Sequence, residues 1–344
     1  MTKIGIIGAG NISDTHARAA LEIDGVEITA IYGHNRDKAT RLAQLYGGAV
    51  YENLESFLEH RPMDMVMIGS PSGLHAEQGI AAARRGLHVL VEKPIDTTVE
   101  RTDLLIDECQ RAGVKLGVFF QDRAAPDIAL LKQLLDEGRL GKPILVSARV
   151  KWYRPSEYYR DSRWRGVFAL DGGGALMNQG VHTVDLLLWL MGDVTRVNAK
   201  AATALHDIEV EDTVVATLEY ANGAIGTLEA TTSVFPGYPR RIELTGSEGT
   251  IIVEDSQIFA ADLRNPAEDL ARIQSRPKEA VDKARSTSPV ISDVSGHRKV
   301  LEDFLRAIET NGKPMCDGYE GRRSVELVLA IYESSRTGNP VTVK

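Results

Sequence analysis

Two polar side chains in an apolar stretch have the types and the spacing that proton transfer needs. Residues 171–185 contain three consecutive glycines and then a predicted apolar helix, on which Asn178 and His182 are four residues apart. Positions i and i+4 lie on one face of an α-helix. Imidazole exchanges protons near neutral pH, so His182 is a candidate acid or base and Asn178 a candidate partner. The alternative for His182 is a core histidine whose hydrogen bonds are satisfied.

A lysine follows a predicted buried strand at a place where ligands commonly bind. Residues 88–91 have the pattern of a strand of a parallel sheet, and Glu92, Lys93 and Pro94 come next. Ligands of open α/β sheets bind outside the carboxyl ends of the strands. An ammonium group there can donate to a substrate hydroxyl or carbonyl oxygen, which makes Lys93 the second catalytic candidate. A solvated surface lysine is the alternative.

A glycine-rich turn near the start of the chain predicts a dinucleotide site. An apolar run over 4–7 leads into this turn, and a predicted helix over 14–21 follows it. Gly8 allows the tight turn, and Gly10 lets the backbone approach a pyrophosphate at the positive end of the helix. Ser13 stands where the pattern usually has glycine or alanine, and an ordinary βα turn is the alternative. The residues of this turn expected to contact the cofactor are Gly8, Gly10, Asn11 and Ile12.

The segment after the second predicted strand bears on the choice between NADP and NAD. Gly33 stands where a carboxylate that binds the ribose 2′-hydroxyl of NAD would fall. Arg36 can bind a 2′-phosphate, so NADP is favoured, with NAD as the alternative cofactor. Further residues expected to contact the cofactor are His34, Asn35, Ser70, Pro71, Ser72, His75, Glu92, Lys93 and Gln121.

Strand-like and helix-like runs alternate over the first third of the chain. Further strands are expected at 26–32, 64–69, 88–91 and 114–120, with helices at 37–46, 74–85 and 99–112. Nearly continuous apolar runs are typical of parallel strands that helices cover on both faces. The pattern predicts an α/β protein whose residues 1–121 form a Rossmann domain with a doubly wound parallel sheet.

The pattern changes after Gln121, where a second α/β domain is expected over 122–344. Predicted strands lie at 144–153, 195–204, 213–220, 224–232, 240–245 and 250–254, and predicted helices at 126–137 and 322–335, before a short strand at 341–343. The Asn222-Gly223 pair is a strong hairpin signal. These strands predict a large, mainly antiparallel meander, which the helix over 181–191 covers on one face. Residues 263–296 are expected to form an excursion or loop.

Aromatic and arginine side chains gather over residues 152–168, which hold six of the chain's 20 aromatic residues. Rings stack on the C–H faces of sugars, and guanidinium groups donate to their hydroxyls. A packed loop is the alternative. The residues expected to bind substrate are Tyr153, Arg154, Tyr159, Trp164 and Arg165, together with Lys93, Asn178 and His182.

Composition narrows the classes of partner. The chain has 344 residues and a net charge of −8, which suits two domains and argues against binding to nucleic acid or to acidic membranes. Cys109 and Cys316 form neither a metal pattern nor a disulfide framework, so no metal is predicted. No apolar segment approaches the ~20 residues of a membrane span, and a cytoplasmic location is expected.

These motifs, in this order, resemble the glucose–fructose oxidoreductase / inositol dehydrogenase family, also called Gfo/Idh/MocA. The resemblance covers nearly the whole chain and rests on the glycine turn at 8–13, the loop at 70–75, the Glu92-Lys93-Pro94 motif and the segment 172–185. It implies a Rossmann domain, a second domain whose open sheet forms a homodimer or homotetramer, and a pyranose-like or cyclitol substrate.

The resemblance also implies that Lys93 and His182 are catalytic, and that Asn178 replaces an aspartate that is usual in the family. Asn178 can orient the ring of His182 but adds no charge. Asp185 is then the nearby acid in the sequence, unless it is a structural residue. The protonation of His182 is expected to depend on Lys93, Asp185 or the substrate.

The implied activity is an NAD(P)-dependent transfer of hydride between nicotinamide and a secondary alcohol of a sugar, sugar derivative or cyclitol. His182 would take the hydroxyl proton, and Lys93 would stabilise the charge that develops on the same oxygen. Two alternatives are a glycosidase that uses NAD for transient oxidation and a non-catalytic sensor that binds NADP.

Overall fold

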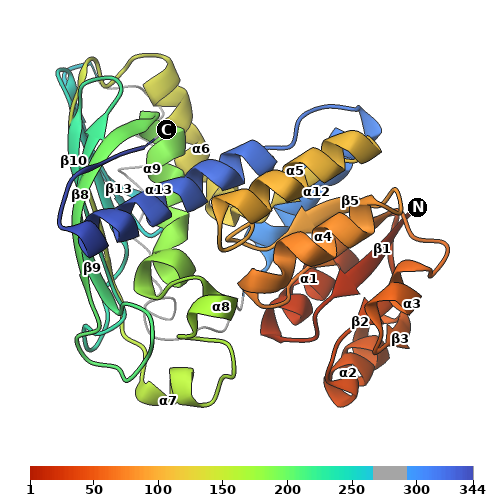
Figure 1. Cartoon of the computed structure of the whole chain (residues 1–344). Helices are drawn as coiled ribbons and strands as arrows, with labels where there is room; N and C mark the ends of the chain where they lie inside the picture. Colours follow the sequence, from red (N-terminus) through yellow and green to blue (C-terminus); the bar gives the residue numbers. More distant parts are fainter. Residues whose placement is uncertain (266–292, 344) are drawn as a thin grey trace. The chain divides into compact units, whose positions relative to one another are not determined.

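The chain forms two compact units in a computed structural model that describes residues 1–265 and 293–343. The first unit comprises Met1–Gln121 and Val290–Val325, and the second comprises Asp122–Pro289 and Glu326–Lys344 (Figure 1). The predicted domain over 122–344 is therefore corrected, because Val290–Val325 belongs to the first unit. Most of the predicted excursion over 263–296 lies outside the described residues.

The first unit contains a six-stranded parallel sheet, with the strands in the order β3-β2-β1-β4-β5-β6. The strands are β1 (Thr2–Ile7), β2 (Val26–Tyr32), β3 (Ala49–Tyr51), β4 (Met65–Ile68), β5 (His88–Val91) and β6 (Leu116–Val118). The sequence runs outward in both directions from the neighbours β1 and β4, which is the switch point where ligands bind in such sheets. The predicted doubly wound sheet is confirmed.

Helices of the first unit pack in pairs, α1 with α12 and α4 with α5 (Figure 1). The helices and helical turns are α1 (Asn11–Leu21), α2 (Arg36–Tyr46), α3 (Leu54–Leu58), η1 (Ser72–Leu74), α4 (His75–Ala83), α5 (Val99–Ala112), the first residue of η2 (Gln121–Ala124), α12 (Ser295–Glu309) and the start of α13 (Gly318–Thr337). Phe304 of α12 packs on Gly117 of β6, where a side chain at position 117 would clash with the ring. This packing explains why α12 belongs to the first unit.

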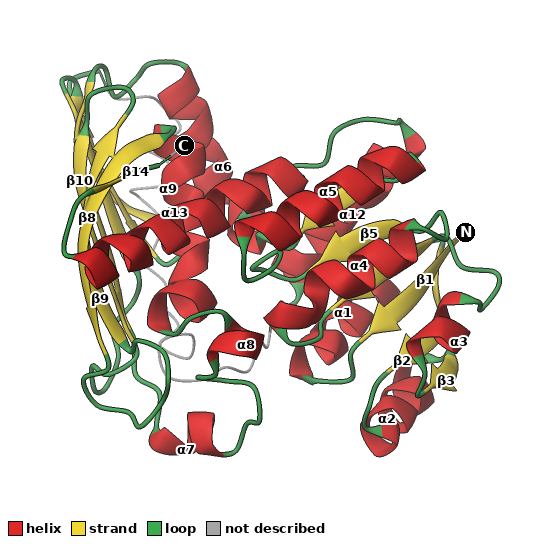
Figure 2. Ribbon diagram, in the orientation of Figure 1, coloured by secondary structure: helices red, strands yellow, loops and turns green. Residues whose placement is uncertain are grey.

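The second unit contains an eight-stranded sheet in the order β13-β12-β11-β7-β10-β9-β8-β14 (Figure 2). The strands are β7 (Pro143–Lys151), β8 (Val194–Ala202), β9 (Thr213–Tyr220), β10 (Ile225–Thr231), β11 (Arg241–Gly246), β12 (Gly249–Glu254), β13 (Gln257–Leu263) and β14 (Val341–Thr342). The mainly antiparallel sheet is confirmed, including the hairpin between β9 and β10. The prediction of a simple meander is wrong, because β7 lies between β11 and β10 and runs parallel to β10.

Helices cover one face of this sheet. The helices and helical turns of the second unit are the rest of η2, α6 (Pro126–Asp136), α7 (Ser156–Arg160), α8 (Phe168–Asp171), the π-helical turn η3 (Ala175–Gly180), α9 (Val181–Met191) and the rest of α13. The apolar helix α9 contacts β7. Leu145, Val215 and Ile225 are exposed on the opposite face. Among the described residues, no helix has the length and apolar character that crossing a membrane requires.

Candidate functional site

The turn between β1 and α1 has the geometry of a pyrophosphate cradle. Gly8 has φ +113°, and a Cβ there would come within 2.7 Å of the Gly69 carbonyl oxygen, so only glycine fits. A Cβ at Gly10 would meet no described atom within 4 Å. Gly10 is the N-cap of α1 and offers no side chain to its first N–H groups. These amides can therefore bind an anion.

The residues after β2 have partners that the sequence did not reveal. Asn35 caps α2 by accepting a bond from the Lys38 amide at 3.0 Å. The Nε2 of His34 lies 3.3 Å from the hydroxyl oxygen of Tyr32, the last residue of β2. The exposed guanidinium of Arg36 pairs with Glu52 at 3.2 Å. A 2′-phosphate at Arg36 would therefore approach a carboxylate as well as a guanidinium.

The two ring nitrogens of His75 face the backbones of two different loops, one after β4 and one after β5. Its Nδ1 lies 2.8 Å from the carbonyl oxygen of Pro94, and its Nε2 lies 2.9 Å from that of Ser70. The ring is buried. Both ring nitrogens already face backbone carbonyls, and a cofactor contact by the His75 ring stays a prediction. The Ser70 hydroxyl is likewise bonded, to Gln78 at 2.6 Å.

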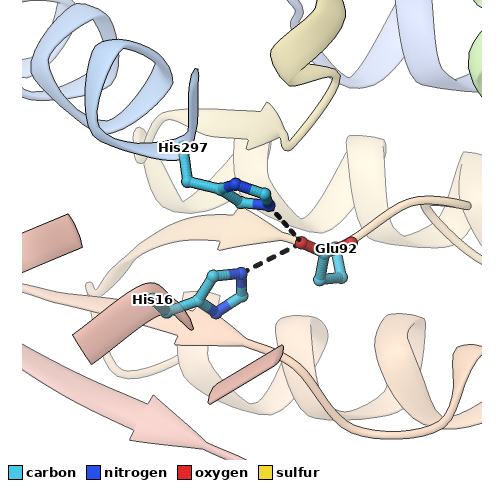
Figure 3. Close-up of side chains that lie close together, drawn as sticks. All are labelled: His16, Glu92 and His297. Carbon is cyan, nitrogen blue, oxygen red and sulfur yellow. Dashed lines mark hydrogen bonds and ion pairs between the residues drawn. The ribbon is translucent and has the colours of Figure 1, made fainter. Parts of the chain in front are cut away.

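The carboxylate of Glu92 lies between two histidines (Figure 3). Its Oε1 is 3.0 Å from His16 Nε2 and 3.7 Å from His297 Nε2, and its Oε2 accepts from the Lys93 amide at 3.1 Å. Burial opposes ionisation, but the two histidines outweigh it and hold the pKa of Glu92 well below its usual value. The cofactor contact of this carboxylate stays a prediction. The three ligand atoms lie within 4.8 Å of one another, so this cluster could also hold a metal ion, which the sequence did not indicate.

One further predicted contact suits a dinucleotide. The Oε1 of Gln121, at the end of the first unit's main segment, is buried and has no hydrogen-bond partner among residues 1–265 and 293–343. A buried acceptor without a donor is costly, and an amide of a bound cofactor would satisfy it. Ser72 and Pro71 lie at the turn η1, directly after β4. Together with the β1–α1 turn, these residues fit a dinucleotide.

In the second unit, the buried carboxylate of Glu211 accepts hydrogen bonds from the backbone of the glycine segment that precedes α9. Glu211 accepts 2.8 Å bonds from the amides of Gly174 and Leu176 and from the Tyr332 hydroxyl. A Cβ at Gly174 would lie 1.7 Å from the backbone oxygen of Glu211, so glycine is required there. Burial raises the pKa of Glu211 to about 7. These hydrogen bonds hold the backbone where the turn that carries Asn178 begins. The sequence did not predict this role of Glu211.

Asn178 lies in the π-helical turn η3, not in an α-helix. The prediction that α-helical spacing relates it to His182 is therefore wrong. Its Nδ2 donates to Asp171 at 2.5 Å, and its Oδ1 accepts from Gln179 at 3.2 Å. Because π-helical turns occur often at functional sites, the irregularity supports the importance of this segment.

His182 has a carboxylate neighbour that the sequence did not predict. Its Nδ1 lies 3.9 Å from Oδ2 of Asp122, and the same Oδ2 accepts from Arg240 at 2.5 Å. The His182 side chain keeps 13% of its surface exposed. Asp185 instead binds Arg123 through two bonds of 2.8 and 2.6 Å. Asp122, and not Asp185, is therefore the acid beside His182.

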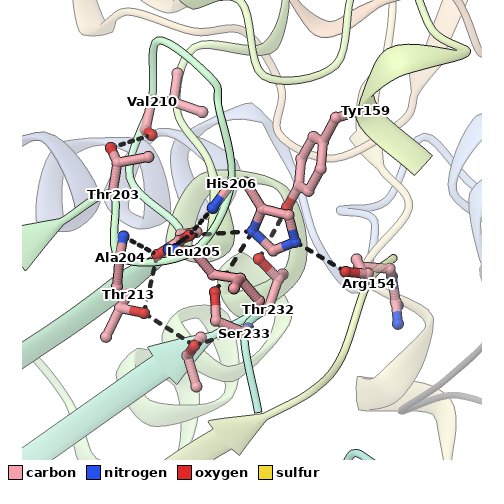
Figure 4. Close-up of polar contacts among 12 residues, drawn as sticks. Arg154, Tyr159, Thr203, Ala204, Leu205, His206, Val210, Thr213, Thr232 and Ser233 are labelled. Carbon is pink, nitrogen blue, oxygen red and sulfur yellow. Dashed lines mark hydrogen bonds and ion pairs between the residues drawn. The ribbon is translucent and has the colours of Figure 1, made fainter. Parts of the chain in front are cut away.

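Two residues of the aromatic segment belong to the core of the second unit (Figure 4). Tyr159 is buried and its hydroxyl bonds Thr232 at 2.8 Å, and its substrate contact stays a prediction. Arg154 is only 2% exposed and donates to the Tyr153 carbonyl at 2.9 Å. His206, which was not predicted, lies 2.9 Å from the Arg154 carbonyl.

The neighbours of His206 resemble a hydrolytic triad in composition only. Its Nδ1 lies 3.0 Å from Asp212 and 3.4 Å from the hydroxyl of Ser233. A nucleophilic serine must face the nitrogen opposite the one that binds the carboxylate, whereas here both groups face Nδ1. The cluster is structural.

The remaining predicted substrate residues are partly exposed. The guanidinium of Arg165 lies 4.1 Å from the ring centre of Tyr158 and 5.2 Å from that of Trp164. The Tyr153 ring packs edge-on to Phe235. Arg165 and Trp164 therefore form a surface that a ligand can reach.

Comparisons with known proteins agree with this architecture. Residues 2–120 match the model of the oxidoreductase family with an NAD-binding Rossmann fold, and residues 128–252 match the GFO/IDH/MocA C-terminal domain. The structure of the WlbA dehydrogenase from Bordetella pertussis, in complex with NADH and UDP-GlcNAcA, is similar with a TM-score of 0.91 and 32% identity. The similarity covers 100% of this chain and 98% of that one.

Curated relatives of similar length include two dehydrogenases. The myo-inositol 2-dehydrogenase of Thermotoga maritima is 25% identical, over 96% of each chain. The D-xylose 1-dehydrogenase (NADP(+)) 2 of Haloferax volcanii is 28% identical, over 98% of each. The chain therefore belongs to the Gfo/Idh/MocA family of NAD(P)-dependent oxidoreductases.

Proposed function

We propose that the protein transfers hydride between a nicotinamide dinucleotide and a secondary alcohol of a sugar, sugar derivative or cyclitol. The observation that carries this proposal is His182, a partly exposed imidazole beside the Asp122 carboxylate at 3.9 Å. A base paired with an acid in this way suits removal of a hydroxyl proton. The names of the relatives, which act on inositol and xylose, support the substrate class.

Each side chain has a definite role in this proposal. When bound, the dinucleotide supplies the hydride acceptor, and the amides at Gly8, Gly10 and the start of α1 would hold its pyrophosphate. His182 accepts the hydroxyl proton, and the Asp122 carboxylate stabilises the imidazolium that results. Lys93 donates to the same substrate oxygen and stabilises its developing negative charge. In the reverse direction, His182 returns the proton.

A substrate screen tests the proposal. Purified protein is incubated with NAD or NADP and with panels of sugars, sugar acids and cyclitols, and nicotinamide absorbance is followed. We expect absorbance to rise at 340 nm with at least one secondary alcohol. Cleavage of a glycoside without net formation of reduced cofactor would point to transient oxidation instead. Tight cofactor binding without turnover of any compound would favour a sensor.

We further propose that the protein prefers NADP through Arg36. No carboxylate occupies the position of Gly33, and the exposed Arg36 guanidinium can turn from Glu52 to a 2′-phosphate. Replacing Arg36 by alanine should raise KM for NADPH about 10-fold and leave KM for NADH nearly unchanged, because a hydrogen bond to a charged group contributes ~1.5–3 kcal/mol. Glu52→Gln should lower KM for NADPH. Equal effects of Arg36→Ala on both cofactors would contradict this assignment.

A further inference from the structure

We propose that Arg165 binds the carboxylate of a sugar-acid substrate, an inference that rests on the function proposed above. Arg165 is partly buried in the aromatic segment of the second unit. Its guanidinium lies over Tyr158 at 4.1 Å and over Trp164 at 5.2 Å, measured to the ring centres. Stacking on two rings restricts the guanidinium without using its N–H donors, and its terminal nitrogens, which are not buried, can donate to a ligand.

The charge of Arg165 has no counter-ion in the part of the chain that the structure describes. No carboxylate there forms an ion pair with it, and its Nε is buried without a hydrogen-bond partner. Arg160, in the same segment, instead pairs with Glu157 and Asp161. Burying part of a cation without an anion is costly. A bound anion would remove this cost, which distinguishes Arg165 from an ordinary surface arginine.

A short series of contacts joins Arg165 to the proposed reacting groups. The hydroxyl of Tyr158, on which Arg165 stacks, accepts from Gln179 Nε2 at 2.8 Å. The same Nε2 donates to Asn178 Oδ1 at 3.2 Å. Asn178 precedes His182 by four residues, across the junction of η3 and α9. Arg165 is therefore placed to bind a substituent of the sugar ring whose hydroxyl reacts at His182.

The chemistry of the guanidinium favours a carboxylate. Its parallel N–H donors match the two oxygens of a carboxylate, and they form stronger bonds to it than to neutral hydroxyls. The Bordetella pertussis relative was solved with UDP-GlcNAcA, which carries a sugar carboxylate as well as a diphosphate. The link through Tyr158 and Gln179 to Asn178 places Arg165 toward the sugar, so we assign the carboxylate and not the diphosphate.

A matched pair of substrates distinguishes binding of the carboxylate from binding of the diphosphate. UDP-GlcNAcA and UDP-GlcNAc differ only in the carboxylate, and kcat/KM is measured for both with the full-length protein. We expect the wild type to prefer UDP-GlcNAcA by about 10- to 100-fold, as a charge-assisted hydrogen bond allows. Arg165→Met should remove most of that preference, because it should lower kcat/KM for UDP-GlcNAcA far more than kcat/KM for UDP-GlcNAc. Arg165→Lys keeps the charge but not the planar fork, and an intermediate loss is expected.

The exposed Arg163 provides the control. Arg163→Met removes the same charge two residues away and should change neither substrate's kcat/KM. An equal loss for both substrates in Arg165→Met would overturn the inference, because it would indicate diphosphate binding or a disturbed loop. An unchanged preference would overturn it as well.

A second readout keeps the inference separate from the proposed function. Binding of glucuronate and of glucose to the wild type and to Arg165→Met is measured by calorimetry, which needs no turnover. Selective loss of glucuronate binding supports the role of Arg165 even if no alcohol is oxidised. Conversely, oxidation of neutral sugars as fast as their uronic acids would overturn the role of Arg165 while the proposed function stands.

Discussion

Replacing Lys93 by methionine, or His182 by alanine, is expected to lower kcat by about 100-fold or more while the fold survives. Acid–base groups contribute ~10²–10⁴-fold, and a donor to a developing oxyanion contributes a comparable amount. Neither side chain forms the apolar core: Lys93 follows β5 in a loop, and His182 retains 13% exposure. Steady-state kinetics on a substrate found in the screen would measure the loss.

Controls separate chemistry from folding. Thermal unfolding should change little in both variants, and cofactor affinity should change little in His182→Ala. Lys142→Met, which removes an exposed lysine, should keep full activity. Added imidazole should partly restore turnover to His182→Ala, because a small base can enter the space left by the ring. Near-normal activity of either variant would reject the role assigned to that residue.

Local patterns predicted most of the first unit. The bounds of β2, β5 and α5 agree with the expected ranges, because apolar runs and helix signals are local properties of the sequence. Local patterns could not predict that α12 belongs to this unit, because its place there depends on the packing of Phe304 against Gly117, which is far away in the chain. The strand order of the second sheet was missed for the same reason, because β7 pairs with β10 and β11 and not with its sequence neighbour.

The sequence predicted the motifs of the candidate site, but it did not predict which acidic residues contact those motifs. Lys93 and His182 lie in recognisable sequence motifs, whereas the acidic residues that contact the site's residues come from distant parts of the sequence. Asp122 lies 60 residues before His182, and Glu211 reaches the Gly174 amide across 37 residues. No sequence signal marked the π-helical turn, whose N-cap Gly174 lies so close to Glu211 that a Cβ there would be 1.7 Å from the Glu211 backbone oxygen. The partners of catalytic groups are fixed by tertiary packing, and a single sequence does not encode that packing as a pattern.

The second large effect is expected on stability, at the buried pair of Arg123 and Asp185. Each side chain is 1% exposed, and they share bonds of 2.8 and 2.6 Å. Removing one partner from such a pair leaves an uncompensated buried charge, which costs about 3–5 kcal/mol. Arg123→Met and Asp185→Leu should therefore each lower the free energy of unfolding of the full chain by about this amount, measured by denaturant titration.

The double variant distinguishes a structural pair from a catalytic one. Replacing both charges by apolar side chains of similar size removes the unpaired charge, so Arg123→Met/Asp185→Leu should recover most of the lost stability. Because Asp122, and not Asp185, lies beside His182, the double variant should also keep most of its turnover and an unchanged pH–rate profile. A stable double variant with a large loss of kcat would show instead that Asp185 acts on His182. Arg160→Met, which breaks an exposed pair, should change stability far less, since solvent screens such charges.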